Sequence, residues 1–149
     1  MYTGRRLIIK GALALTALMS MPRALFAVAW PQQAFASTVA REALINLLGT
    51  DQTTLSDEIN FTLPAIAESG VNVPLSVETS LPGIKSISIF VINNPRPLAI
   101  SFKFSPDTLP KLACRIKMAE TSEVMAVVVT NSGIFSTSRE TKVTEGGCA

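Results

Sequence analysis

The sequence contains no histidine, and this absence removes several kinds of active site at once. The Ser-His-Asp and Cys-His arrangements of nucleophilic catalysis need an imidazole base, and the usual zinc sites include a histidine ligand. The sequence also lacks a glycine-rich loop that could cradle a phosphate. Its acidic residues are scattered, and no pair of carboxylates is singled out for acid/base chemistry. We therefore expect no catalytic residues, no metal site and no bound cofactor, and a chain that is not an enzyme by itself.

Acidic residues are also missing from the start of the chain, where the first is Glu42. Arg5 and Arg6 stand there in the stretch TGRRLIIK, which resembles the twin-arginine motif of exported proteins. The apolar run at residues 11–21 is too short to span a bilayer as a helix, which takes about 20 residues. These features together are typical of a signal peptide.

Two small-x-small sites of the kind that signal peptidase accepts follow the apolar run, at residues 27–29 and 34–36. We expect cleavage after Ala29, with Ala36 as the second candidate. Residues 1–29 are then a twin-arginine signal peptide, and the mature protein is periplasmic with no membrane anchor. An uncleaved amphipathic segment or membrane anchor is the alternative.

Removal of residues 1–29 changes the sign of the net charge. The chain has 13 basic and 11 acidic residues, and four of the basic ones lie in the signal peptide. Nine basic residues then face 11 acidic ones, which leaves a net charge of −2. A domain with this charge has no electrostatic reason to bind nucleic acid or an anionic membrane.

The mature chain begins with one predicted helix and a linker at residues 30–57. Ser37 or Thr38 can serve as the N-cap, and Gly49 can end the helix. Apolar residues recur between them at three-four spacing, at Val39, Ala43, Leu44, Leu47 and Leu48. Residues 50–58 are polar and predict a linker or loop.

Beyond the linker, the period of the apolar residues changes from helical to strand-like. Seven strands are predicted, at residues 58–63, 72–79, 84–92, 98–104, 112–118, 124–130 and 133–144. Turn residues separate them at short intervals, which favours hairpins over helical crossovers. We predict an all-β fold, an immunoglobulin-like antiparallel β-sandwich at residues 58–144 with one N-terminal α-helix. The strand at 124–129 is apolar on both faces, so it lies either centrally in the sandwich or partly under a partner.

The two cysteines have different surroundings. Strand alternation places Cys114 on the same face as Leu112, Ile116 and Met118, which predicts a buried apolar thiol. Cys148 follows Gly146 and Gly147 in a C-terminal arm at residues 145–149, which two glycines make flexible. The alternatives are a disulfide between the two cysteines, which would require the arm to fold back, and a tail cysteine without a function.

Four stretches of the mature chain together resemble one family. They are LPAIAESG at residues 63–70, VPLSVE at 73–78, INNPRP at 92–97 and TKVTEGGC at 141–148. The first two resemble the LPEIAENG and VPVTVE stretches of the family, the third its NPRP loop, and the fourth its closing strand and arm. On these motifs and the twin-arginine start, the chain resembles SoxY, the carrier subunit of the bacterial Sox thiosulfate-oxidising system.

The resemblance implies a sulfur carrier, with Cys148 as the covalent attachment site on the flexible arm formed with Gly146 and Gly147. In the family, the carrier pairs with SoxZ and is visited by a haem enzyme (SoxAX), a hydrolase (SoxB) and, where present, a molybdenum-containing dehydrogenase (SoxCD). The family arm usually ends Gly-Gly-Cys-Gly-Gly, whereas this sequence ends in Cys148 and Ala149.

A binding or structural module is the rival interpretation. Such a module would dock on another subunit, and Cys148 would make a disulfide. Glu145 and the terminal carboxylate lie close to Cys148 in sequence and disfavour its thiolate. We therefore expect the free thiol to react slowly outside a basic pocket of a partner.

Overall fold

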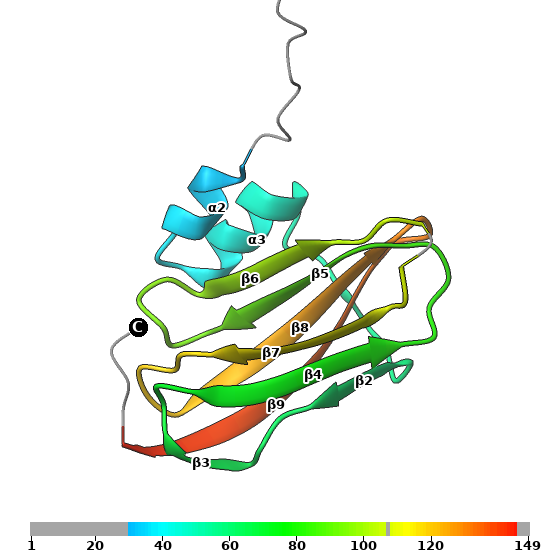
Figure 1. Cartoon of the computed structure of the whole chain (residues 1–149). Coiled ribbons are helices and arrows are strands. Elements are labelled where there is room, and N and C mark those ends of the chain that lie inside the picture. Colours follow the sequence, from blue (N-terminus) through cyan, green and yellow to red (C-terminus); the bar gives the residue numbers. More distant parts are fainter. Residues whose placement is uncertain (1–29, 107, 146–149) are drawn as a thin grey trace, which may run out of the picture. The chain divides into compact units, whose positions relative to one another are not determined.

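The computed structural model describes residues 30–106 and 108–145, and the structural statements below concern this part of the chain. Two β-sheets lie face to face, and two short helices lie against the larger sheet (Figure 1). The helices are α2 (Gln32–Ala36) and α3 (Ala40–Leu48). The strands are β1 (Thr54–Leu55), β2 (Ile59–Thr62), β3 (Ile66–Ser69), β4 (Val73–Thr79), β5 (Ile84–Val91), β6 (Leu98–Lys103), β7 (Lys111–Ile116), β8 (Ser122–Thr130) and β9 (Ile134–Glu145). Neither helix is long and apolar enough to cross a membrane.

The larger sheet has six strands, in the order β1-β9-β8-β5-β6 with β3 also beside β9. β1 and β3 run parallel to β9 at different places along it, because Thr54 is opposite Phe135 and Ile66 is opposite Lys142. The smaller sheet contains β2, β4 and β7, all antiparallel. The predicted immunoglobulin-like β-sandwich is therefore confirmed.

All seven predicted strands are present, as β2 and β4 to β9, with ends that differ by one or two residues. Sequence analysis missed β1 and β3. β1 lies inside the predicted linker and is only two residues long, so it shows no alternation. β3 lies between two predicted breaks, Pro64 and Gly70, and three of its four residues are exposed. Both strands form because they pair in parallel with the edge of β9. This is a tertiary interaction, which local sequence patterns do not show.

The N-terminal segment forms two helices where sequence analysis expected one. The expected caps of the longer helix, Ser37 and Thr38, are wrong: the N-cap of α3 is Val39, and no side chain caps the helix. Ser37 instead ends α2, where its Oγ donates to the Gln33 carbonyl at 2.8 Å and accepts from Asn46 Nδ2 at 3.0 Å. Gly49 ends α3 in the left-handed conformation, with φ of 79°, as predicted.

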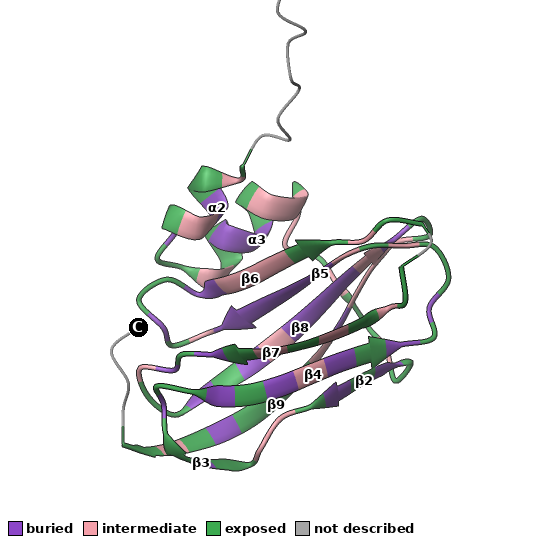
Figure 2. Cartoon of the chain, viewed as in Figure 1, coloured by how far each residue is buried: buried purple, intermediate pink, exposed green. Residues whose placement is uncertain are grey.

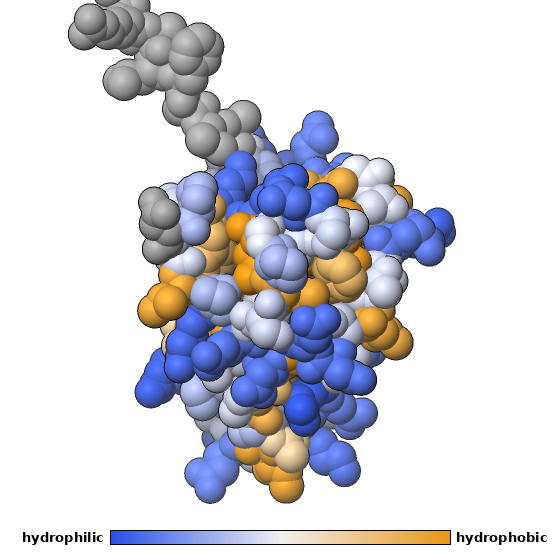
Figure 3. Space-filling view, turned by 90° about the vertical axis from the view of Figure 1, so that its right-hand side faces the viewer, coloured by the Kyte–Doolittle hydropathy of each residue, from blue (hydrophilic) through white to orange (hydrophobic). Residues whose placement is uncertain are grey.

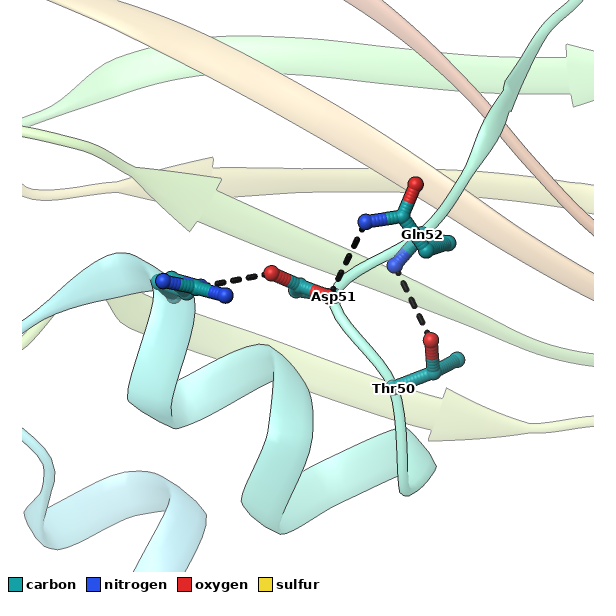
Figure 4. Close-up of polar contacts among 4 residues, drawn as sticks. Thr50, Asp51 and Gln52 are labelled. Carbon is teal, nitrogen blue, oxygen red and sulfur yellow. Dashed lines mark hydrogen bonds and ion pairs between the residues drawn. The ribbon is translucent and has the colours of Figure 1, made fainter.

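The chain that leaves α3 is held against the start of the helix. Arg41 Nε lies 2.6 Å from Asp51 Oδ2, and Gln52 Nε2 donates to Asp51 Oδ1 at 3.2 Å (Figure 4). The Gln52 backbone N–H donates to Thr50 Oγ1 at 3.0 Å. The hydrogen bond from Arg41 is the main reason that the pKa of the Asp51 carboxyl is lowered. These contacts fix the turn that leads from α3 into β1.

The main hydrophobic core lies between the two sheets, and Figure 2 marks its buried residues along the strands of both. In β8 the inward side chains alternate with residues that point to the outer face of the larger sheet. Fully buried residues of this core include Phe61, Val73, Val77, Ile87, Ile89, Val91, Val124, Ala126 and Val128.

A second hydrophobic cluster covers the outer face of the larger sheet. Ala34, Ala43 and Leu44 of the helices pack there against Phe90, Leu98 and Val127. β8 is therefore apolar on both faces because one face meets the smaller sheet and the other meets the helices. It also lies between β5 and β9, which confirms the central position predicted for residues 124–129.

The inter-sheet core contains Phe61 of β2, and the helix-covered cluster contains Phe90 of β5. Because both side chains are fully buried, truncation of either should destabilise the isolated chain by a similar amount. We expect Phe90→Ala and Phe61→Ala each to lower the free energy of unfolding by about 3–5 kcal/mol. Phe102 is 46% exposed and has only an edge contact with Phe104, so Phe102→Ala should cost about 1 kcal/mol. Urea unfolding measures all three. A Phe90→Ala loss as small as that of Phe102→Ala would contradict a helix-covered outer face.

Candidate functional site: the root of the C-terminal arm

The arm predicted at residues 145–149 enters the structure through its first residue. Glu145 is the last residue of β9, whereas Gly146, Gly147 and Cys148 lie outside the described residues. Arg5 and Arg6 of the predicted export motif lie outside them as well. The structure therefore shows what holds the base of the arm, which we call the arm root: Glu145 and the backbone groups bonded to it.

The end of β9 is held along its open edge by β3. Ile66 is opposite Lys142 and Ser69 is opposite Glu145 in a parallel pairing. Thr144 Oγ1 donates to the Glu68 carbonyl at 2.8 Å. Thr141 is fully buried, and its Oγ1 donates to the Pro64 carbonyl at 2.8 Å. Because these bonds lie on several successive residues, β9 stays paired as far as the arm root.

Gly70 joins the arm root to the other sheet. Its N–H donates to the Glu145 carbonyl at 2.8 Å, and its own carbonyl accepts from the Met118 N–H at 2.7 Å. Glu145 ends β9 in the larger sheet, whereas Met118 follows β7 of the smaller sheet and is fully buried. Gly70 thus lies at the corner where the chain passes from β3 in one layer to β4 in the other.

Asn94 of the NPRP loop fixes the backbone next to Met118. Its Nδ2 donates to the Lys117 carbonyl at 2.8 Å, and its Oδ1 accepts from the Ala119 N–H at 2.8 Å. Asn94 is 8% exposed, so these two bonds satisfy the polar atoms of a buried side chain. The side chain acts as a clamp between the β5–β6 turn and the chain that joins β7 to β8.

A second set of bonds connects the same turn to β9. Asn93 Nδ2 donates to the Thr121 carbonyl at 2.9 Å, and the Val143 N–H donates to Thr121 Oγ1 at 3.0 Å. Three of the sequence motifs therefore meet at one end of the sandwich, on the left in Figure 1: LPAIAESG with β3, INNPRP with the β5–β6 turn, and TKVTEGGC with the end of β9. The motifs are visible in the sequence, but no local pattern identifies Asn94, Thr121 and Thr141 as the residues that connect them.

Cys114 lies away from the arm root, near the middle of β7, opposite Leu75 of β4. It packs against the inter-sheet core as predicted but is only partly buried, because β7 is at the edge of the three-stranded sheet. Burial raises the pKa of the Cys114 thiol above its ordinary value. The reactive thiolate is correspondingly scarce near neutral pH. Among the described residues, no group of three or more His, Cys, Asp and Glu side chains could hold a metal ion.

Comparison with known families and structures identifies the family of this chain. A family model described as "Sulfur oxidation protein SoxY" matches residues 44–148. The chain belongs to the SoxY family. The solved structure of the sulfur carrier protein SoxY from Chlorobium limicola f thiosulfatophilum is 34% identical, with a TM-score of 0.65. The match covers 77% of this chain and all of that one.

A more distant structure shares the fold alone. The superoxide reductase (neelaredoxin) from Ignicoccus hospitalis is 12% identical with a TM-score of 0.51, and the match covers 61% of this chain and 94% of that one. No curated protein sequence matches this SoxY-family chain. The family match extends to residue 148 and therefore includes the whole arm root and the cysteine beyond it.

The clamp predicts different effects for two adjacent asparagines. Asn94→Ala removes both part-buried hydrogen bonds, to the Lys117 carbonyl and from the Ala119 N–H, and we expect it to lower the free energy of unfolding by about 1–3 kcal/mol. It should also speed hydrogen exchange at Ala119 and Met118. Asn93→Ala removes one exposed side-chain bond and is the matched control, with an expected loss below about 1 kcal/mol. Equal losses in the two variants would contradict the clamp.

The raised pKa of Cys114 predicts its reactivity. Alkylation of Cys114 by iodoacetamide should be slower than that of a free cysteine at neutral pH, and its rate should keep rising with pH beyond the point where an ordinary thiol levels off. Unfolding in urea should remove the difference, because it removes the burial. Peptide mass mapping assigns the label to each cysteine. Native Cys114 labelling as fast as that of the unfolded chain would contradict this account.

Proposed function

We propose that this protein is a sulfur carrier that holds thiosulfate-derived sulfur on Cys148 and presents it to Sox enzymes. Membership of the SoxY family, over a match that reaches Cys148, is the observation that carries the proposal. The 34%-identical structure is itself a sulfur carrier protein. The arm root supports it, because a carrier needs a fixed base for the arm on an otherwise rigid domain.

The chemistry of the arm can be written as two balanced steps. The thiol of Cys148 and the outer sulfur of thiosulfate form a disulfide bond, with loss of one proton and transfer of two electrons to the haem enzyme. Water then attacks the terminal sulfonate sulfur, which leaves as sulfate with release of two protons, and a cysteine persulfide remains. The carrier contributes only the thiol sulfur of Cys148 and the arm that holds it. Its lack of histidine is compatible with this division, because the partner enzymes supply the acid/base and redox groups.

The reach of the arm fits a tethered substrate. From Glu145 to Ala149 an extended chain spans roughly 15 Å at about 3.3–3.6 Å per residue. Such a tether keeps the bound sulfur at a high effective concentration near whichever enzyme has docked. The negative charge of Glu145, close to Cys148 in sequence, disfavours the Cys148 thiolate, so basic surroundings in a partner would activate the thiol.

We further propose that the protein works in the periplasm, after export by the twin-arginine pathway and cleavage after Ala29. Cleavage after Ala36 would remove α2, whose Ala34 is fully buried against α3 and the larger sheet. SoxZ is the proposed heterodimer partner, and SoxAX, SoxB and SoxCD are the proposed visiting enzymes. The rival docking module loses one argument, because the helices of the chain itself cover the apolar outer face of β8.

Replacement of each cysteine in turn tests the carrier role. Cys148→Ser should abolish thiosulfate-dependent electron transfer in a reconstituted Sox system, because no other residue is proposed to take up the sulfur. Cys114→Ser is the matched control and should keep most of the turnover. Co-purification with SoxZ should survive both changes. A Cys148→Ser protein with normal turnover would contradict the carrier role and favour the docking module.

A further inference from the structure

A basic cavity lies between the edges of the two sheets, and its lining residue Lys117 immediately precedes Met118, which Gly70 joins to the arm root. Its volume is about 270 Å³, and its lining residues are Asn94, Arg96, Ala99, Ile100, Arg115, Ile116 and Lys117. Within the described chain β6 pairs only with β5 and β7 pairs only with β4, so the cavity opens between two unpaired strand edges. Since a water molecule takes up about 30 Å³ in the liquid, the cavity has room for a small polyatomic anion and several waters.

The cavity is positively charged, whereas the expected net charge of the mature protein is −2. Three of its lining residues are cationic and none is acidic. Arg41 and Lys111 form ion pairs in the described chain, with Asp51 and Glu78, but Arg96, Arg115 and Lys117 have no acidic partner there. A hollow lined by charge of one sign focuses the electric field and raises the local concentration of the opposite ion. Guanidinium groups in particular match the geometry of oxyanions.

The clamp already described holds the backbone that carries two of the cationic residues. Asn94 lines the cavity and bonds to the backbone on both sides of Met118, which fixes the NPRP loop to the residues that follow β7. Pro95 and Pro97 flank Arg96 and restrict the backbone φ of the loop. The backbone positions of Arg96 and Lys117 are therefore set relative to each other before any ligand arrives.

The cavity also lies within reach of the arm. Two successive backbone hydrogen bonds connect Glu145 to Gly70 and Gly70 to Met118, which follows Lys117. At about 4.8 Å between hydrogen-bonded backbones, Met118 lies roughly 10 Å from Glu145. Three residues separate Glu145 from Cys148, and their extended length is also about 10 Å. A group attached to the thiol extends this reach further.

We propose that Asn94, Arg96, Arg115 and Lys117 form an oxyanion cradle, a site for the sulfonate or sulfate group of a sulfur oxyanion. The choice of ligand rests on the proposed carrier function, and the cradle itself rests on the cavity, its charge and its place beside the arm root. The ligand has two possible sources, a sulfonate at the end of a group on Cys148 or a free oxyanion from solution. In the first case the cradle holds the loaded arm against the protein between visits to enzymes.

Two charge-matched double variants test the cradle. Arg96→Gln with Lys117→Gln removes two charges from the cradle. Lys85→Gln with Lys103→Gln removes two charges from a separate cavity of about 550 Å³ at the opposite end of the sandwich. That end faces the viewer in Figure 3, where hydrophilic side chains alternate with small apolar patches. Equal unfolding midpoints for the two variants would show that both are folded.

Backbone amide chemical shifts report on the cradle. Cys148 is loaded with tetrathionate in the Cys114→Ser background, where its thiolate displaces one thiosulfate and forms a Cys148–S–S–SO₃⁻ group. Loading should shift the amides of residues 94–97 and 115–119 in the parent and in the Lys85/Lys103 variant, but not in the Arg96/Lys117 variant. Free thiosulfate, added to unloaded Cys148→Ser protein, should shift the same amides with a Kd about 10-fold weaker in the Arg96/Lys117 variant.

The outcomes distinguish the two sources of the ligand, the loaded arm and the solution. They also separate a failure of the cradle from a failure of the carrier role. Shifts on loading alone assign the ligand to the arm, and shifts with free thiosulfate alone keep the oxyanion site but assign its ligand to solution. A fully loaded protein without shifts, together with no response to thiosulfate, overturns the cradle. Equal amide shifts in the two double variants, on loading and with thiosulfate, also overturn the cradle. None of these results depends on turnover, so normal Sox turnover by Cys148→Ser would overturn the carrier role without deciding on the cradle.

Discussion

Two backbone hydrogen bonds at Gly70 connect the parts of this protein that matter most for its proposed work. One bond holds the last residue of β9, where the arm begins, and the other holds the start of the β7–β8 connection in the opposite sheet. The arm root is therefore fixed to both layers of the sandwich. Met118, which donates one of the two bonds, is fully buried in the inter-sheet core. A carrier that must offer a thiol to several enzymes gains from such a base, because only the arm then has to move.

The helices explain why so small a domain can have a larger sheet that is apolar on both faces. They cover the outer face from one side and leave the edges of β6 and β7 unpaired within the described chain. The basic cavity lies between these two open edges, and the Gly70 hydrogen bonds join the residue that follows Lys117 of its lining to the arm root. Under the proposed carrier function, the same end of the sandwich combines the tether with a candidate resting place for its cargo.

Local sequence patterns predicted the strands that alternate and bury one face, such as β2 and β4, and the glycine that ends α3. They did not predict β1 and β3, because a strand of two or four mostly exposed residues has no period and forms only where β9 offers an edge. The Ser37 cap was wrong because the chain forms a second helix that uses this residue at its end. Asn94 was part of a quoted turn motif, but its role depends on a backbone more than 20 residues away in sequence, with which no local pattern connects it. The attachment role of Cys148 came from family resemblance and not from spacing or composition.

The central claim is that Cys148 carries sulfur, and the intact mass of the protein taken from the cells that produce it tests this most directly. The account predicts a fraction with added sulfur or thiosulfonate mass, lost on treatment with reductant and mapped to the peptide that contains Cys148. A mass lower by two hydrogens, with a Cys114–Cys148 crosslink in the peptide map, would contradict it. The C-terminal arm would then be a structural staple, and the chain a docking module.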